Sequence, residues 1–217
     1  MNFSKTIETI FSFVKNLFAK KEKEEIFENN NTTRFVVLDT ETTGFDYNKD
    51  RILCIGAIVL QNNSISIKDS FEVYIEQEYY NQSTAQIHGI LREIVLQRPK
   101  EEEALQQFLD FLGDSIVIAH HAKFDITMIN NALERNGLSK LTNKTIDTAE
   151  LYKKSLLKSP LLERKEHYSL DDLAEKFDIS TKDRHTALGD AYITAIAFLK
   201  IVEKLRKKRD VTLSYLV

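Results

Sequence analysis

Two acidic residues, Asp39 and Glu41, lie one residue apart at the end of an apolar run, in the stretch FVVLDTETTGFD. The run predicts a short buried strand, which places both carboxylates where a hydrophobic core is expected. Residues i and i+2 of a strand share one face, so the two side chains point the same way. Because burying an uncompensated carboxylate is costly, the pair requires a metal ion or a set of hydrogen-bond donors.

Two further acids lie against apolar structure later in the chain. Asp125 follows SIVIAHHAKF at a predicted strand-to-helix crossing, and Asp190 lies among small and apolar residues in RHTALGDAYITAIAFL. Each acid alone fits a helix cap, a salt bridge or a chance surface position equally well. Four carboxylates together suit hard divalent cations, which prefer oxygen ligands, whereas no Cys or His cluster has the spacing of a zinc site. Two Mg²⁺ or Mn²⁺ ions in such a set would stabilise the attacking and leaving oxygens of a phosphodiester.

His185 precedes Asp190 by five residues, at the point where the last helix is expected to begin. The ordinary pKa of histidine, about 6.5, suits the removal of a proton from water near neutral pH. The alternative is a hydrogen-bonded surface or capping histidine. The nearby acids favour the interpretation as a general base.

The hydrophobic periodicity predicts the elements that must position these residues. Apolar or alternating runs indicate three strands, over residues 35–39, 52–60 and 64–75, with a turn at 61–63. The elements expected after them are a helix over 101–112, a strand in SIVIAH, a helix over 123–135, a strand and turn in KTIDTAELY, a helix in SLDDLAEKF and a long helix over 186–206. Three antiparallel strands followed by alternating helices and strands predict an α/β fold, with a mixed central sheet and helices on both faces.

The chain divides into three segments by composition. In residues 1–30, an apolar stripe over 3–18 predicts an amphipathic helix, and the charged, asparagine-rich stretch after it predicts a linker. Residues 31–205 form the predicted globular domain, and residues 206–217, which begin with RKKR, form a basic C-terminal tail. The stripe suits a helix packed on its own domain, which we favour slightly, or a docking helix for a protein partner or a membrane surface.

Composition limits the classes of function. The net charge of −3 over 217 residues argues against broad electrostatic coating of nucleic acid, but not against an acidic site that reaches phosphates through divalent cations. A single cysteine, Cys54, excludes an intrachain disulfide, as is typical of a reducing compartment, so we expect a cytoplasmic protein. No stretch approaches the roughly 20 apolar residues of a membrane-spanning helix.

Several of these motifs resemble those of a known family. LDTETTGF, AHHAKFD and RHTALGDA are similar to the three motifs of the DEDDh (DnaQ-like) 3′–5′ exonucleases, which include the proofreading epsilon subunit of bacterial DNA polymerase III. The likeness spans about residues 34 to 203 in the family's order, and also includes QIHGI and IDTAELY. The resemblance implies a ribonuclease-H-like fold.

The resemblance also implies a role for each reactive residue. Asp39 would bridge two metal ions, Glu41 and Asp190 would complete the first metal site, and Asp125 would hold the second ion, partly through water. His185 would be the general base that activates the attacking water. The product would be a 5′ mononucleotide released from a 3′ end.

Substrate contacts follow from the same resemblance. His88 in QIHGI and the backbone around Thr42 would contact the terminal nucleotide, and single-stranded DNA ends are the favoured substrate, in proofreading or repair. RNA trimming is the alternative within the family, and a non-catalytic, polymerase-associated adaptor is the alternative outside it. The presence of all five reactive residues argues against the adaptor. One departure is His121, which stands where the family usually has Asn.

Overall fold

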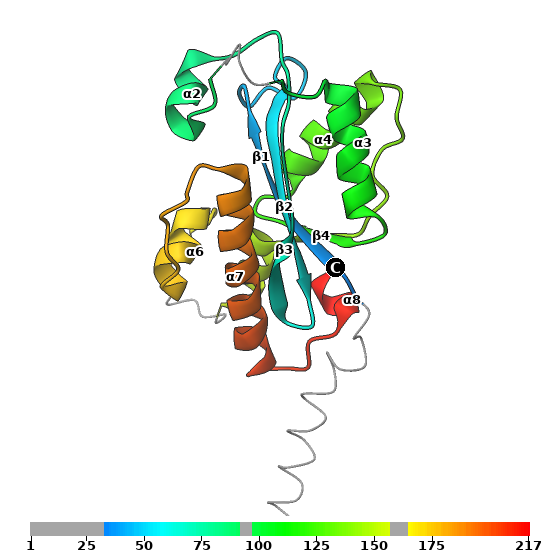
Figure 1. Ribbon diagram of the computed structural model, residues 1–217. Helices are drawn as coiled ribbons and strands as arrows, with labels where there is room; N and C mark the ends of the chain where they lie inside the picture. The colour runs from blue at the N-terminus through cyan, green and yellow to red at the C-terminus, as the bar shows by residue number, and fades with distance from the viewer. Residues whose placement is uncertain (1–32, 92–96, 157–164) are drawn as a thin grey trace, which may run out of the picture.

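The computed structural model describes residues 33–91, 97–156 and 165–217 (Figure 1), so the helix predicted within residues 1–30 lies outside the described residues. A five-stranded mixed sheet forms the centre, in the order β3-β2-β1-β4-β5. The first three strands are antiparallel and the last two run parallel to β1: β1 (Phe35–Thr42), β2 (Ile52–Gln61), β3 (Ser64–Tyr74), β4 (Ile116–Ala119) and β5 (Thr145–Asp147). The predicted mixed sheet is confirmed.

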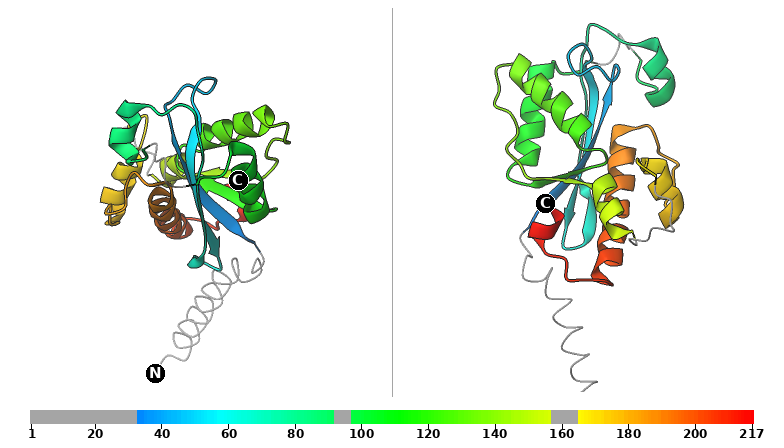
Figure 2. Two further views of the ribbon diagram at one scale, coloured as in Figure 1. Left: turned by 45° about the horizontal axis from the view of Figure 1, so that its top comes forward. Right: turned by 180° about the vertical axis from the view of Figure 1, so that it is seen from behind.

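Helices cover both faces of this sheet (Figures 1 and 2). One face carries α3 (Glu101–Leu112) and α4 (Lys123–Arg135). The other face carries α5 (Thr148–Ser155), α6 (Leu170–Phe177) and the long α7 (Ala187–Arg206). Two short helices, α2 (Gln82–His88) and α8 (Leu213–Leu216), lie near opposite ends of the molecule. Among the described helices, none is long and apolar enough to cross a membrane.

The alternation of side chains along β1 divides the core into two layers. Phe35 and Val37 belong to the hydrophobic cluster under α5 and α7, whereas Val36 and Leu38 belong to the cluster under α3 and α4. Side chains of successive strand residues point to opposite faces. The alternation therefore directs Asp39 toward the α7 face of the sheet.

Strand β1 is longer than the predicted 35–39. It pairs with β2 as far as Thr42 opposite Ile52, with a register shift after Glu41, so both Asp39 and Glu41 are strand residues. The extension to Thr42 was not predicted, because carboxylates are depleted from strands and the two acids suggest that the strand has ended.

Among the short helices that were not expected from the sequence are α2 and α5, which precede α6. The stretch KTIDTAELY forms β5 and then α5, where a strand and turn were predicted. The Asp147 side chain begins α5 by accepting a hydrogen bond from the backbone N–H of Ala149 at 2.8 Å. Helix α2 is likewise begun by the Asn81 side chain. Helices α2 and α5 make only about two turns each and were not recognised from an apolar period, so the prediction of a strand and turn over residues 144–152 was wrong in its second half.

The segment after α7 folds back onto the domain. Residues 206–217, expected as a basic tail, include α8, and Val211 and Leu216 are buried in the cluster under α7. Lys208 donates a hydrogen bond to the carbonyl of Ser155 at 2.7 Å, and the Arg209 guanidinium lies 4.2 Å from the ring centre of Tyr215. These contacts tie the basic residues to the folded domain.

Candidate active site

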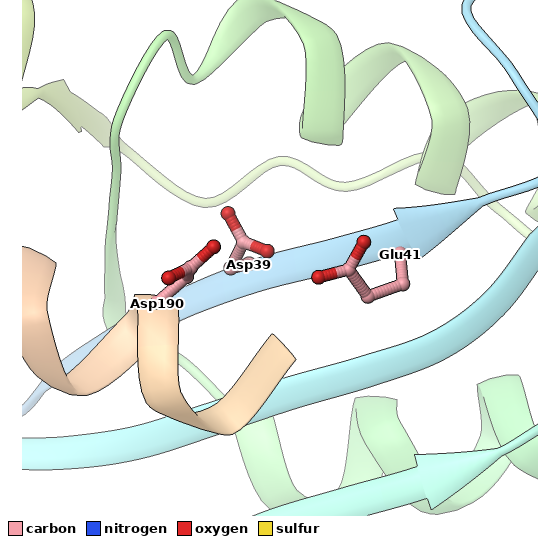
Figure 3. Close-up of side chains that lie close together, drawn as sticks. All are labelled: Asp39, Glu41 and Asp190. Atoms are coloured by element: carbon pink, nitrogen blue, oxygen red, sulfur yellow. The ribbon is translucent and has the colours of Figure 1, made fainter. Parts of the chain in front are cut away.

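Three of the predicted acids meet on the α7 face of β1. Asp39 and Glu41 project from β1 and Asp190 from the first turn of α7 (Figure 3). One carboxylate oxygen from each residue lies within 4.8 Å of the other two. The i, i+2 spacing in the strand and the start of the helix together build this carboxylate triad, as we name Asp39, Glu41 and Asp190.

A glycine allows α7 to come close enough for the triad to form. Gly56 is the β2 partner of Asp39 in the antiparallel ladder. A Cβ atom at Gly56 would lie 2.2 Å from the backbone nitrogen of Leu188 and 2.3 Å from the carbonyl carbon of Ala187. Only a glycine therefore lets the first turn of α7 rest directly on the backbone of β2. That contact places Asp190 beside Asp39.

Asp125 is held by different partners. It is buried in the first turn of α4, and its Oδ1 accepts hydrogen bonds from the backbone N–H of Thr40 at 3.0 Å and from its hydroxyl at 2.7 Å. Burial raises the pKa of Asp125 to about 7, and the hydrogen bonds from Thr40 oppose that rise. Its charge raises the pKa of Asp39, so the fourth acid lies near the triad although it is not part of the group of three.

The triad is electrostatically crowded. Burial raises the pKa of Asp39 well above the ordinary value, and the charges of Asp125, Asp190 and Glu41 raise it further. Burial, and then the charge of Asp190, raise the pKa of Glu41 to about 7. Asp190 Oδ1 is buried and has no hydrogen-bond partner among the described residues. Hard oxygen ligands, mutual repulsion and an unpaired buried oxygen fit a divalent cation.

His185 lies on the turn that joins α6 to α7. Its side chain is exposed, and its backbone adopts a left-handed conformation with φ 66°. A Cβ atom at Gly189 would lie 2.0 Å from the carbonyl oxygen of Asp183, so this glycine lets the turn fold over the start of the helix. The charge of His185 lowers the pKa of Asp190, which indicates that the imidazole lies near the triad.

Arg184 is a site residue that the sequence analysis missed. Its Nη1 donates to Asp190 Oδ2, and its Nε donates to Asp171 Oδ1 at 2.6 Å. The signal available in the sequence was a lone cation next to His185 in an otherwise acidic and apolar motif.

The two predicted substrate contacts lie at the end of β1. His88 ends α2, and its Nδ1 accepts a hydrogen bond from the backbone N–H of Ile90 at 3.0 Å. Burial lowers the pKa of His88, and the backbone of Thr42 opposes this effect, which places the imidazole beside that strand end. Asn81 donates to the carbonyl of Thr43 at 3.0 Å and ties the start of α2 to the same place.

Comparison with known proteins decides the family. The profile of the exonuclease family RNase_T matches residues 36–198, which include all the acids described above. The chain belongs to this exonuclease family. Exonucleases of the family depend on divalent metal ions, in agreement with the chemistry of the triad.

Two curated relatives of this exonuclease carry the name DNA polymerase III. The DNA polymerase III subunit epsilon of Aquifex aeolicus is 35% identical over 171 residues, which cover 79% of this chain and 81% of that protein. The PolC-type DNA polymerase III of Caldanaerobacter subterraneus is 35% identical over 174 residues. The chain spans only 12% of the length of this PolC-type relative.

Solved structures share the fold at low sequence identity. E. coli Exonuclease I in complex with a dT13 oligonucleotide has a TM-score of 0.66 and 18% identity, over 82% of this chain and 42% of that one. Cell-death related nuclease 4 (CRN-4) has a TM-score of 0.69 and 13% identity, over 80% of this chain and 64% of that one. These likenesses confirm the exonuclease fold that the motifs implied.

An aromatic cluster beside the exonuclease site was also missed. Phe45, in the turn after β1, is 78% exposed. Its ring centre lies 5.7 Å from that of Phe124, which in turn lies 5.8 Å from that of Tyr47. Tyr47 and Phe124 are partly buried, and Phe124 directly precedes Asp125, so the cluster adjoins one of the acids along α4. The cue in the sequence was an aromatic residue in each of the first two exonuclease motifs.

The departure from the family at His121 has a simple conformational account. His121 has φ 57°, a left-handed conformation in which His, like Asn, is enriched. The neighbouring His120 is held at both ring nitrogens, 2.9 Å from the Thr148 hydroxyl and 2.9 Å from the carbonyl of Tyr168. Burial lowers the pKa of His120 to about 4, so its imidazole stays neutral near pH 7. These contacts favour a packed, structural role for His120, while the exposed His121 lies edge-on to it, with ring centres 4.6 Å apart.

Proposed function

We propose that this exonuclease hydrolyses the phosphodiester bond at the 3′ end of single-stranded DNA and releases 5′ mononucleotides, in proofreading or repair. The observation that carries the proposal is the convergence of three carboxylate oxygens within 4.8 Å on one face of the sheet. The epsilon and PolC-type relatives are named as parts of DNA polymerase III, which supports DNA as the substrate and a place beside a polymerase.

Within this proposal the acids hold two divalent cations, Mg²⁺ or Mn²⁺. Asp39, Glu41 and Asp190 would hold the first, and Asp39 and Asp125 would hold the second. Cations bound there would neutralise charge on the phosphate and on the attacking and leaving oxygens. Thr40 fixes one oxygen of Asp125 with two hydrogen bonds, so this carboxylate is oriented before any ligand arrives.

The remaining residues act on the water and on the nucleotide. His185 accepts the proton of the attacking water, and its exposed position on the turn leaves the imidazole free to reach that water. His88 and the backbone at Thr42 contact the terminal nucleotide. The exposed ring of Phe45 offers a surface on which a base stacks, an interaction that tolerates any sequence.

The proposal is tested with 5′-labelled single-stranded DNA and RNA of one sequence, each incubated with Mg²⁺, Mn²⁺ or chelator. We expect a ladder that shortens from the 3′ end of DNA, requires divalent metal and is absent with Asp39→Ala. Faster degradation of RNA would assign the enzyme to RNA trimming. A folded, metal-supplied protein that degrades neither substrate would contradict the proposed activity.

A further inference from the structure

Arg184 connects the carboxylate triad to helix α6. Its Nη1 donates to Asp190 Oδ2, while Nε and Nη2 donate to the two oxygens of Asp171 at 2.6 and 3.1 Å. The Arg184 side chain is 17% exposed and that of Asp190 only 7% exposed. The guanidinium is therefore a largely desolvated cation inserted between an exposed acid and a buried one.

The charge of Arg184 acts on the whole triad. It lowers the pKa of Asp39, Glu41 and Asp190, opposing the effects of burial and of the neighbouring acids. A guanidinium has a fixed positive charge and carries it wherever it is bound. Arg184 thus supplies the same type of compensation that a divalent cation would supply at this cluster, with one charge in place of two.

The other end of the guanidinium is anchored on a rigid element. Asp171 lies in the first turn of α6, where the Ser169 side chain accepts from the backbone N–H of Asp172 and the Asp172 side chain accepts from that of Ser169. This capping box fixes the start of the helix. The bidentate pair with Asp171 can therefore hold Arg184 at the edge of the triad whether or not Nη1 remains on Asp190.

We propose that Arg184 is an internal counter-cation of the carboxylate triad, which competes with divalent cations for Asp190 and so sets the metal affinity of the site. The inference rests on the proposed metal site and goes beyond it, because it assigns a positioning residue that binds neither metal nor substrate. Arg184 lowers the affinity for metal by repelling the incoming cation and by neutralising its ligands in advance. Its positive charge also offsets the mutual repulsion of the four acids in the folded chain.

The test measures Mn²⁺ affinity and thermal stability in three variants of the full chain. Arg184→Gln removes the charge, Arg184→Lys keeps the charge without the bidentate geometry, and Arg34→Gln is the matched control. Arg34 is also a partly buried arginine, but it bonds to the carbonyl of Leu112 at the opposite end of β1. Titration calorimetry is done at one fixed pH, above the Glu41 pKa of about 7, for the unaltered chain and all three variants.

We expect Arg184→Gln to bind Mn²⁺ about fivefold more tightly than the unaltered chain. Its midpoint of thermal unfolding falls in chelator and rises more on addition of Mn²⁺ than that of the unaltered chain. Arg184→Lys and Arg34→Gln keep the Mn²⁺ affinity of the unaltered chain within about twofold.

The outcomes separate this inference from the proposed function. An Arg184→Gln variant with unchanged Mn²⁺ affinity, and with the same loss of stability in chelator and in Mn²⁺, would overturn the counter-cation role while leaving the metal site intact. An Arg184→Lys variant that binds as tightly as Arg184→Gln would also overturn it. Failure of the unaltered chain to bind Mn²⁺ would instead remove the metal site on which the inference rests.

Discussion

The carboxylates on the two faces of β1 differ in how their negative charge is compensated. On the α4 face, Asp125 is satisfied by the chain itself, through the N–H and hydroxyl of Thr40. On the α7 face, Asp39, Glu41 and Asp190 crowd together, and one oxygen of Asp190 has no hydrogen-bond partner among the described residues. A protein that needed only structure would satisfy both faces alike. The difference indicates that the carboxylates of the α7 face depend on a ligand for compensation, whereas Asp125 already has one oxygen satisfied by the chain and offers only the other.

The largest effect is expected from Asp39→Ala. The variant should lose activity by about ten-thousandfold or more, because the loss of one residue from a group that acts as a catalytic unit removes most of the effect of the whole group. Its thermal stability should be unchanged or slightly higher, because the substitution relieves repulsion within the triad. Rates on labelled DNA and thermal unfolding in chelator measure the two effects.

The matched variant on the other face is Asp125→Ala. It leaves the buried N–H of Thr40 without its acceptor and should cost about 1 to 3 kcal/mol of unfolding free energy. Equal losses of stability in the two variants would remove the contrast between the faces.

The next effect concerns His185. His185→Ala should lower the rate near neutral pH by about a thousandfold, as expected for loss of a general base, while the Mn²⁺ affinity changes by less than about twofold. The deficit should shrink as pH rises, because hydroxide becomes more abundant. His167→Ala is the control, since the side chain of His167 is 75% exposed on the loop before α6. An unaltered pH–rate profile in His185→Ala would refute the assignment.

A smaller loss should follow from Gly56→Ala. The added methyl group collides with the backbone of Leu188, so the start of α7 must move away from β2 and carry Asp190 with it. A displacement of about 1 Å at a catalytic group can cost about a hundredfold in rate, and here the Mn²⁺ affinity should fall as well. Gly137→Ala is the matched control, because Gly137 has φ 69° and open space around its Cβ position. It should lose stability and keep its activity and metal affinity.

The smallest expected effect is a pH-dependent loss of stability on the α4 face of β1, where Thr40 donates hydrogen bonds to Asp125. The raised pKa of Asp125, about 7 against an ordinary 3.8, means that the folded chain holds this proton more tightly than the unfolded chain. Stability therefore falls as pH rises through that window. Thr40→Val removes one donor to the ionised carboxylate, so it should cost about 1 to 2 kcal/mol above pH 7 and less near pH 5. Urea unfolding in chelator at the two pH values measures the difference, and an equal cost at both would contradict it.

The sequence predicted most of the fold because its strands and long helices carry strong periods. The apolar runs of β1 and β2 place these elements directly, and the types and spacing of Asp39, Glu41 and Asp190 indicated them as candidates without any geometry. The full length of β1 was not predicted, because Asp39 and Glu41 at its end suggest that the strand has ended. Helix α5 depends on one side-chain cap, Asp147, rather than on a period.

The contacts that adjust the charge and geometry of the site could not be predicted from the sequence for a different reason. The pair between Arg184 and Asp171 joins residues thirteen positions apart, on a turn and on a helix whose relative placement only packing decides. The separation of Asp125 from the triad depends on which face of β1 Thr40 occupies. The need for glycine at position 56 arises from the backbone of a helix more than a hundred residues later, which no local pattern records.

The alternation along β1 also limits how this gene segment can change. Substitutions at Phe35 to Leu38 need only preserve apolar volume within each layer. A single-residue insertion or deletion between these positions and Asp39 would shift the phase of the strand by one and send the carboxylates into the layer beneath α3 and α4. Descendants of this sequence should therefore vary among apolar residue types here while the length of the segment stays fixed.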